Sequence, residues 1–232
     1  MKEPVKDTVK DTVKDIVLFG TGAMAEVIAV YLRAHSDYRI VGYTVDAAFH
    51  DAERHDGLPL VAWEALEDRF PPGEVLLLGP LTYRRMNTVR RDRYLEGRAR
   101  GYGFARFLHP ASHIYTDRIG ENCVILEANV IQPFAEIGDN VIIWSGNHIG
   151  HHSRIGDHCF IASKVAISGH VTVGPECYLG GQVGIPHGLT LGRGCALLNQ
   201  THIVRDLADH SVVAGTPGTI KPFPSTRLHK LI

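Results

Sequence analysis

Aliphatic residues recur at every sixth position through the second half of the chain. Counting in sixes from Ile119 to Ile203, all 15 positions carry Ile, Val or Leu, and glycine follows several of them, as at Gly120 and Gly156. An α-helix repeats every 3.6 residues and a strand every two, so neither produces this spacing. A hexapeptide β-helix does, because each of its flat sides turns one aliphatic side chain inward. The second half is therefore predicted to be a parallel β-helix.

The first half follows a different pattern, in which short apolar runs alternate with helical stretches. Ile16 to Phe19 predicts a buried strand, which leads into a glycine-rich turn and a helix that ends near Arg33. The other expected elements are strands at 39–43 and 75–78 and helices at 64–70 and 83–100. This alternation is typical of a Rossmann-like α/β domain with a parallel sheet. The region is too short for a complete two-lobed dinucleotide-binding fold.

The two patterns divide the chain of 232 residues into four segments. A polar lead-in with repeated VKDT sequences covers residues 1–15, and the α/β domain covers residues 16–110. The repeat domain is expected over residues 111–215, followed by a tail at residues 216–232.

Two columns of polar or reactive residues follow from a coil of three hexapeptides. The four cysteines are Cys123, Cys159, Cys177 and Cys195, and the spacings between them are whole numbers of such coils. This spacing predicts a column of small side chains packed inside the coil, and a redox site or metal ligand set is the alternative. Asn129, Asn147 and Thr201 share a second column. There a buried amide ladder is expected, with a catalytic Asn147 as the alternative.

Composition narrows the class of protein. Lys and Arg number 24 against 25 Asp and Glu, which is not the bulk charge of a dedicated nucleic-acid binder. The longest apolar stretch, residues 16–32, contains Glu26 and two glycines, so no membrane span is expected. The N-terminus is charged throughout, unlike a secretory signal, and no CxxC pair is present. We therefore expect a cytoplasmic protein with reduced thiols.

Several motifs together resemble a known family. The hexapeptide run followed by residues 213–218 (VAGTPG) resembles the left-handed β-helix acyltransferases. The glycine-rich loop at 20–25, Asp46, the arginines between 84 and 91, and the LHPA sequence at 108–111 are similar to the family of sialic-acid O-acetyltransferases and bacillosamine or perosamine N-acetyltransferases. The resemblance implies a left-handed, triangular β-helix and a homotrimer. It also implies acetyl transfer from acetyl-CoA to an amine or hydroxyl of a nucleotide-linked sugar.

The resemblance also implies roles for particular residues. His151 takes the position of the general base, and His152 stands where the family commonly has an acidic residue. Gly169 follows His151 by three hexapeptides, or one full coil, so its backbone N–H is the candidate oxyanion donor, with a tight corner that needs glycine as the alternative. The residues expected to contact CoA are Phe160, Gly169, Gly181, Asn199 and Lys221. The residues expected to bind the sugar nucleotide are Gly20, Thr21, Gly22, Ala23, Met24, Asp46, Arg84 and His148. His158 and His170 are expected to be bystanders.

Other functions stay open at this stage. A sugar O-acetyltransferase has the same fold, and the identity of the sugar and of its nucleotide (UDP, dTDP or GDP) is undetermined. A γ-class carbonic anhydrase needs three histidine ligands, and although His151 and His187 share a column, position 192 is Gly. No metal is therefore expected. A trimeric scaffold without catalytic activity is the third alternative, and turnover of a thioester would exclude it.

Overall fold

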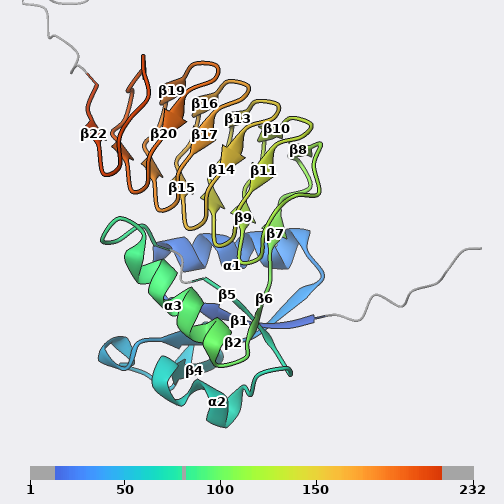
Figure 1. Ribbon diagram of the computed structural model, residues 1–232. Helices are drawn as coiled ribbons and strands as arrows, with labels where there is room; N and C mark the ends of the chain where they lie inside the picture. Colours follow the sequence, from blue (N-terminus) through green and yellow to red (C-terminus); the bar gives the residue numbers. More distant parts are fainter. Residues whose placement is uncertain (1–13, 80–81, 216–232) are drawn as a thin grey trace, which may run out of the picture.

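The computed structural model describes residues 14–79 and 82–215. An α/β domain and a β-helix of stacked coils pack against each other, with the chain passing from one to the other once (Figure 1).

The N-terminal domain is a six-stranded sheet in the order β3-β4-β2-β1-β5-β6. Its strands are β1 (Lys14–Phe19), β2 (Tyr38–Val45), β3 (Arg54–His55), β4 (Leu58–Ala62), β5 (Leu76–Leu78) and β6 (Gly103–Phe104). Its helices are α1 (Ala23–His35), α2 (Leu66–Arg69) and α3 (Thr88–Ala99), with short 3-10 turns at Ala47–Phe49 and Trp63–Ala65. Alternate residues of β1 face opposite sides, so Ile16 packs with α1 and Val17 with the side that carries α2 and α3. The Rossmann-like winding is as expected.

Some boundaries differ from the sequence-based expectation. Strand β1 begins at Lys14, two residues inside the expected polar lead-in. Helix α3 begins only at Thr88, because Arg85, Met86 and Asn87 have φ values of 51°, 51° and 64° in the left-handed region. A left-handed turn of three residues cannot continue an α-helix. The short strands β3 and β4 were not expected, and residues 1–13 and the tail at 216–232 lie outside the described residues.

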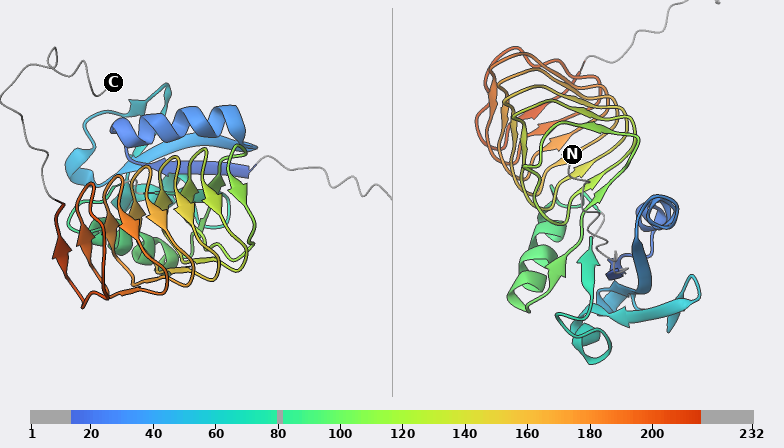
Figure 2. Two further views of the ribbon diagram at one scale, coloured as in Figure 1. Left: turned by 90° about the horizontal axis from the view of Figure 1, so that it is seen from above. Right: turned by 90° about the vertical axis from the view of Figure 1, so that its right-hand side faces the viewer.

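The C-terminal domain consists of short parallel strands in three sheets, which form the sides of a triangular prism (Figure 2). The first sheet holds β7 (Phe107–Leu108), β9 (Val124–Ile125), β12 (Ile142–Ile143), β15 (Phe160–Ile161), β18 (Tyr178–Leu179), β21 (Ala196–Leu197) and β22 (Val212–Val213). The second holds β8 (His113–Ile114), β10 (Val130–Ile131), β13 (His148–Ile149), β16 (Ala166–Ile167) and β19 (Gly184–Ile185). The third holds β11 (Glu136–Ile137), β14 (Arg154–Ile155), β17 (Thr172–Val173) and β20 (Thr190–Leu191).

Each coil of three hexapeptides stacks on the next, so the six-residue pattern places its aliphatic side chains inside the prism. In the second sheet His148 is in register with Ala166, and Ala166 with Gly184. The inward residues, such as Ile149 and Ile167, are completely buried in one continuous core. Burial of this apolar column is the main force that holds the coils together.

The cysteine column lies inside the same core. All four cysteines are free and fully buried, and each Sγ lies 3.1–3.3 Å from a backbone carbonyl oxygen of the coil. Burial raises the pKa of the Cys123 thiol to about 12. These thiols are packing residues, as the spacing predicts, and not a redox site.

The asparagine column forms the expected amide ladder. Asn147 Nδ2 donates to Asn129 Oδ1 at 2.9 Å, and Asn147 Oδ1 accepts from the backbone N–H of Val165 at 2.7 Å. The Asn147 side chain is buried and its amide is used within the coil. The catalytic alternative for Asn147 is therefore not retained.

The α/β domain covers one side of the prism. Helix α1 packs on the first sheet through side chains such as Ile142 and Phe160. At the adjoining edge, the buried Arg90 of α3 donates to the carbonyl oxygens of His158 and Cys159 at 2.6 and 2.9 Å. In a triangular prism, the edge between the second and third sheets lies opposite the first sheet, and hence away from the α/β domain (Figure 2). None of the helices in the described ranges has the length and apolar character needed to cross a bilayer.

Candidate active site

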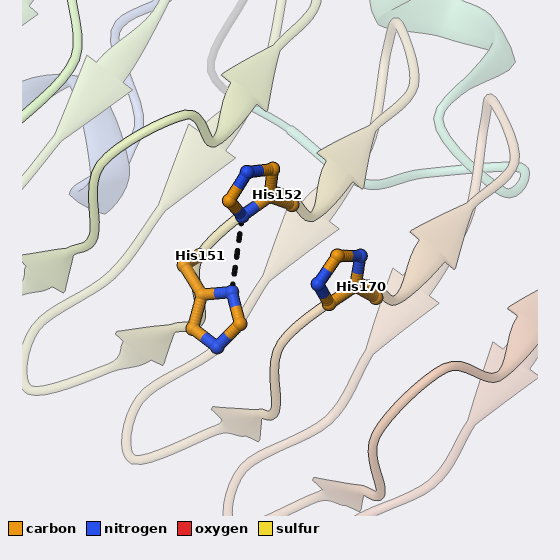
Figure 3. A group of neighbouring side chains, drawn as sticks. All are labelled: His151, His152 and His170. Atoms are coloured by element: carbon orange, nitrogen blue, oxygen red, sulfur yellow. Dashed lines mark hydrogen bonds between the residues drawn. The ribbon is translucent and has the colours of Figure 1, made fainter.

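A cluster of histidines occupies this opposite edge. His151 and His152 form the turn between β13 and β14, and His170 lies in the turn one coil further on (Figure 3). The two Nδ1 atoms of His151 and His152 are 3.1 Å apart, within hydrogen-bonding distance. The rings of His152 and His170 are stacked at 4.8 Å with an angle of 4° between their planes. All three side chains are exposed, so the cluster is open to a ligand.

Neighbouring residues fix the two central rings. The backbone N–H of His151 donates to Gln132 Oε1 at 2.9 Å. The ring of His152 lies between Phe134, at 4.7 Å between centroids, and His170 on the stacked side. Desolvation and the charges of the neighbouring histidines lower the pKa of His170. His170 is therefore less inclined than a free imidazole to carry a positive charge.

Gly169 lies directly against the His151 ring. A Cβ at this position would be 2.7 Å from His151 Nε2, so any side chain here displaces the imidazole. At corresponding turn positions of other edges, the N–H groups of Asp139 and Gly181 donate to a side-chain oxygen of the next coil. Within residues 14–79 and 82–215, the Gly169 N–H has no such acceptor. The structure thus places a proton acceptor and an unused N–H donor side by side, which are the groups that acyl transfer requires.

A pocket of about 460 Å³ lies at the N-terminal end of α1, in the α/β domain. Gly20, with φ +120°, turns the chain out of β1, and Gly22 caps α1 without any side-chain hydrogen bond to its first turn. The first N–H groups of a helix are left unpaired and favour anions such as phosphate. The pocket is lined by Phe19, Gly20, Thr21, Gly22, Ala23, Met24, Ala25, Val45, Asp46, Phe49, Thr82, Arg84 and Val89.

The pocket brings together all the residues expected to bind the sugar nucleotide except His148. Asp46 is held by an ion pair with Arg93 of α3, at 2.7 Å between Oδ1 and Nε. His148 instead starts β13, with an exposed side chain three residues before His151. Phe49 is 58% exposed at the pocket wall and was not singled out from the sequence.

The residues expected to contact CoA are distributed over different parts of the β-helix. The backbone N–H of Gly181 donates to Asn199 Oδ1 at 2.9 Å, at the edge between the first and second sheets. Asn199 also borders a hollow of about 460 Å³, with Tyr178, Leu198 and Gly215 among its lining residues. Lys221 lies outside the described residues.

The buried position of Phe160 differs from the exposed position that the expected contact with CoA implies. Its side chain is 3% exposed, with the rings of Tyr83 and Tyr178 at 4.9 and 5.7 Å, on the side of the prism that packs against the α/β domain. A covered ring in this position supports the contact between the two domains and leaves no exposed aromatic face for CoA.

His170 and Phe134 belong to the cluster although the sequence pattern did not single them out for it. His170 lies one coil of three hexapeptides after His152, and Phe134 lies one coil before it. The same spacing that connects His151 with Gly169 could have identified both.

Comparisons with known proteins agree with this architecture. The family model "Bacterial transferase hexapeptide (six repeats)" matches residues 118–151, 134–169 and 152–187. No curated protein matches the chain in sequence. PerB from Caulobacter crescentus, in complex with CoA and GDP-perosamine, is 26% identical with a TM-score of 0.78, and the match covers 90% of this chain and 98% of that one.

Two further solved structures share the fold. A variant of perosamine N-acetyltransferase from Caulobacter crescentus is 24% identical with a TM-score of 0.76, over 91% of this chain and 99% of that one. The acetyltransferase domain of PglB from Neisseria gonorrhoeae, with acetyl coenzyme A, is 21% identical with a TM-score of 0.77, over 89% of this chain and 98% of that one. The predicted fold class is confirmed, with a Rossmann-like domain followed by a left-handed β-helix.

Proposed function

We propose that this chain, a hexapeptide-repeat protein with the two-domain fold of the sugar acetyltransferases, transfers an acetyl group from acetyl-CoA to a nucleotide-linked sugar. One observation carries the proposal: His151 Nε2 lies against Gly169, whose N–H has no acceptor among the described residues. A base and an oxyanion donor side by side match the two demands of thioester aminolysis or alcoholysis. PerB, the similar structure described above, binds CoA and GDP-perosamine.

In the proposed reaction, the acceptor nitrogen or oxygen attacks the acetyl carbonyl carbon. His151 Nε2 takes the acceptor's proton, and the Gly169 N–H donates to the developing oxyanion. Collapse of the tetrahedral intermediate breaks the carbon–sulfur bond. The CoA thiolate then recovers the proton from the His151 imidazolium, which returns the site to its starting state.

His152 serves this step as a positioning residue. When His151 donates its Nδ1–H to His152 Nδ1 across the 3.1 Å contact, the lone pair of His151 lies on Nε2, which faces Gly169. The family usually places a carboxylate at this position. An imidazole held between Phe134 and His170 orients the base in the same way, without adding a negative charge.

The pocket at α1 is the proposed site of the sugar nucleotide. Its unpaired N–H groups and Arg84 suit a pyrophosphate, and Asp46 and Phe49 offer a carboxylate and an aromatic face at its wall. We favour an amino sugar as the acceptor, because PerB binds GDP-perosamine and the variant compared above is an N-acetyltransferase.

The separation of the two sites within one chain supports a homotrimer. The pocket belongs to the α/β domain, whereas His151 lies on the edge of the prism that faces away from that domain. A closed ring of copies brings the His151 edge of one chain to the pocket of the next. We propose that each active site is built by two subunits, with CoA bound near Gly181 and Asn199. The free, buried thiols suit a reducing compartment, so we place the enzyme in the cytoplasm.

Release of free thiol from acetyl-CoA tests the function directly. We expect turnover with at least one member of a panel of nucleotide-linked amino sugars, and slower or no turnover with the matching hydroxyl sugars. Binding of CoA and nucleotide without turnover of any acceptor would contradict the proposal and favour a scaffold that only binds ligands.

A further inference from the structure

The histidine cluster has a capacity that the proposed reaction does not use. His151, His152 and His170 each offer a ring nitrogen, and these nitrogen atoms lie within 4.8 Å of one another on an exposed edge. Acetyl transfer uses the first as a base and the second to orient it, whereas no ring nitrogen of His170, which stacks on His152, is used in that step. A fourth ring, His187, lies 5.1 Å from His170 between centroids.

The chemistry of this donor set favours a divalent transition metal. Neutral imidazole nitrogens bind Zn²⁺, Cu²⁺ and Ni²⁺, whereas Mg²⁺ and Ca²⁺ prefer oxygen ligands. Tetrahedral zinc with Zn–N bonds of about 2.0–2.1 Å places neighbouring ligand nitrogens about 3.3 Å apart. The Nδ1 atoms of His151 and His152 are already 3.1 Å apart. For the third ligand, the exposed His170 ring turns out of its stack with His152, and the fourth position is open to water or His187.

We propose that His151, His152 and His170 form a zinc-binding site and that zinc bound there switches off acetyl transfer. The second part of this inference rests on the proposed function. Without metal, the two Nδ1 atoms share one proton, and His151 Nε2 carries the lone pair. Zinc takes the place of that proton between the two nitrogens.

The switch is a change of tautomer. A neutral imidazole that binds metal through Nδ1 carries its proton on Nε2. The proton that leaves His151 Nδ1 is therefore balanced by one that arrives at Nε2 through water, and the ring keeps its charge. His151 Nε2 becomes an N–H donor that faces Gly169, and it can no longer take a proton from the acceptor. The same contact that prepares the base thus makes it sensitive to metal.

Calorimetric titration of the substrate-free protein with zinc chloride tests the site itself. We expect one Zn²⁺ per chain for the wild type and at least about tenfold weaker binding for His170→Asn, which removes one ligand while keeping a side chain of similar size. His113→Asn, a change of another exposed histidine at the start of β8, is the matched control and should bind like the wild type. Magnesium chloride should produce no binding. Equal zinc affinity for His170→Asn and the wild type would overturn the proposed site.

Two further measurements test the switch. Nitrogen-15 NMR of labelled histidine should show the His151 proton on Nε2 when zinc is bound and on Nδ1 after its removal by a chelator. In the thiol-release assay, each protein is compared with its own metal-free rate. Zinc should inhibit the wild type and His113→Asn reversibly, while the rate of His170→Asn should not change at the same concentration. An unchanged tautomer, or full activity with zinc bound, would overturn the switch. Because calorimetry and NMR need no acceptor, a failure of the proposed acetyl transfer would be recognised separately, by the acceptor panel.

Discussion

The imidazole of His151 fits against Gly169 because glycine has no Cβ. The imidazole fills the space where a Cβ would lie, 2.7 Å from Nε2. The backbone of Gly169 has an ordinary negative φ, unlike that of Gly146 or Gly188, so left-handed geometry is not why glycine is needed here. Close approach of the ring is the physical reason, and it connects this glycine to the chemistry.

Replacing Gly169 should therefore damage the reaction and leave the fold intact. In Gly169→Ala the new methyl group pushes the His151 ring away from the acceptor. We expect kcat to fall by about 10²-fold, the effect of a displacement of about 1 Å at a reacting group. The melting temperature and the KM for acetyl-CoA should stay near the wild-type values. Wild-type kcat for the alanine variant would show that the ring can move without loss of function.

Variants of His151 and of His148 on β13 test which of the two histidines is the general base. His151→Asn should lose about 10²- to 10⁴-fold in kcat, the usual contribution of a general base, and should still bind both ligands. His148→Asn, three residues earlier and also exposed, should retain most of its kcat. If His148→Asn is inactive and His151→Asn turns over within a few-fold of the wild type, the base is assigned to the wrong histidine.

At the scale of elements, the coil and helix α1 have separate tasks. The coil packs its aliphatic and thiol side chains inward, so its chemistry is limited to its edges and to the outward side chains of its strands, such as His148. Helix α1 buries Ile28 and Leu32 in the core that the α/β sheet shares with the prism, and it leaves its N-terminal end open at the pocket. The sugar nucleotide and CoA should therefore respond independently to changes in these two elements.

The cysteine column predicts inert thiols. Burial raises the pKa of Cys123 to about 12 and also raises that of Cys195, while a hydrogen bond with Cys159, together with burial, raises that of Cys177. Since the thiolate is the reactive form, the native protein should not react with a thiol reagent within minutes at neutral pH. In denaturant all four thiols should react. Rapid labelling of the native protein would contradict the packing of this column.

A large side chain at Gly22, the N-cap of α1, should block binding of the sugar nucleotide but not of acetyl-CoA. A Cβ at Gly22 has no atom within 4 Å, and its φ of −86° suits any residue. Gly22→Trp should therefore fold normally, fill the pocket and raise the KM for the nucleotide sugar at least about tenfold, or ~1.4 kcal/mol. Gly22→Ala is the control, because a methyl group leaves the pocket open. An equal rise in the KM for acetyl-CoA would refute the separate tasks of the two elements.

At the scale of the whole molecule, the position of the α/β domain decides how the active site is assembled. It covers the first sheet, so the His151 edge of the same chain faces away from it. In the proposed assembly, the acceptor in the pocket of one chain meets His151 of another copy. The homotrimer is thus a requirement of the proposed reaction.

Mixing two inactive variants tests this assembly. One chain carries His151→Asn and the other Gly22→Trp, and each alone should be nearly inactive. After the subunits are exchanged by reversible unfolding, random mixing should restore about a quarter of the sites, because each needs an intact edge from one copy and an intact pocket from the next. Sedimentation should give the mass of a trimer. No recovery in exchanged trimers would place both halves of the site within one chain.

The six-residue repeat by itself determined the β-helix, the buried cysteine column, the amide ladder and the contact between His151 and Gly169. The reason is that stacking after every third hexapeptide is a local rule, so a residue's position in the sequence is enough to identify its neighbours in the adjoining coils. Applied to His152, the same rule predicts the stack with His170.

Only the tertiary structure decided what depends on contacts without such a period. Arg90 reaches His158 and Cys159 across 68 and 69 residues, and Phe160 is covered by Tyr83 from the other domain. The left-handed turn at Arg85–Asn87, which shortens α3, accompanies this docking, since Asn87 Nδ2 donates to the carbonyl oxygens of Glu176 and Cys177. Which side of the prism the α/β domain covers, and therefore which edge is left for the histidines, is set by the sum of these long-range contacts. No spacing along the chain encodes it.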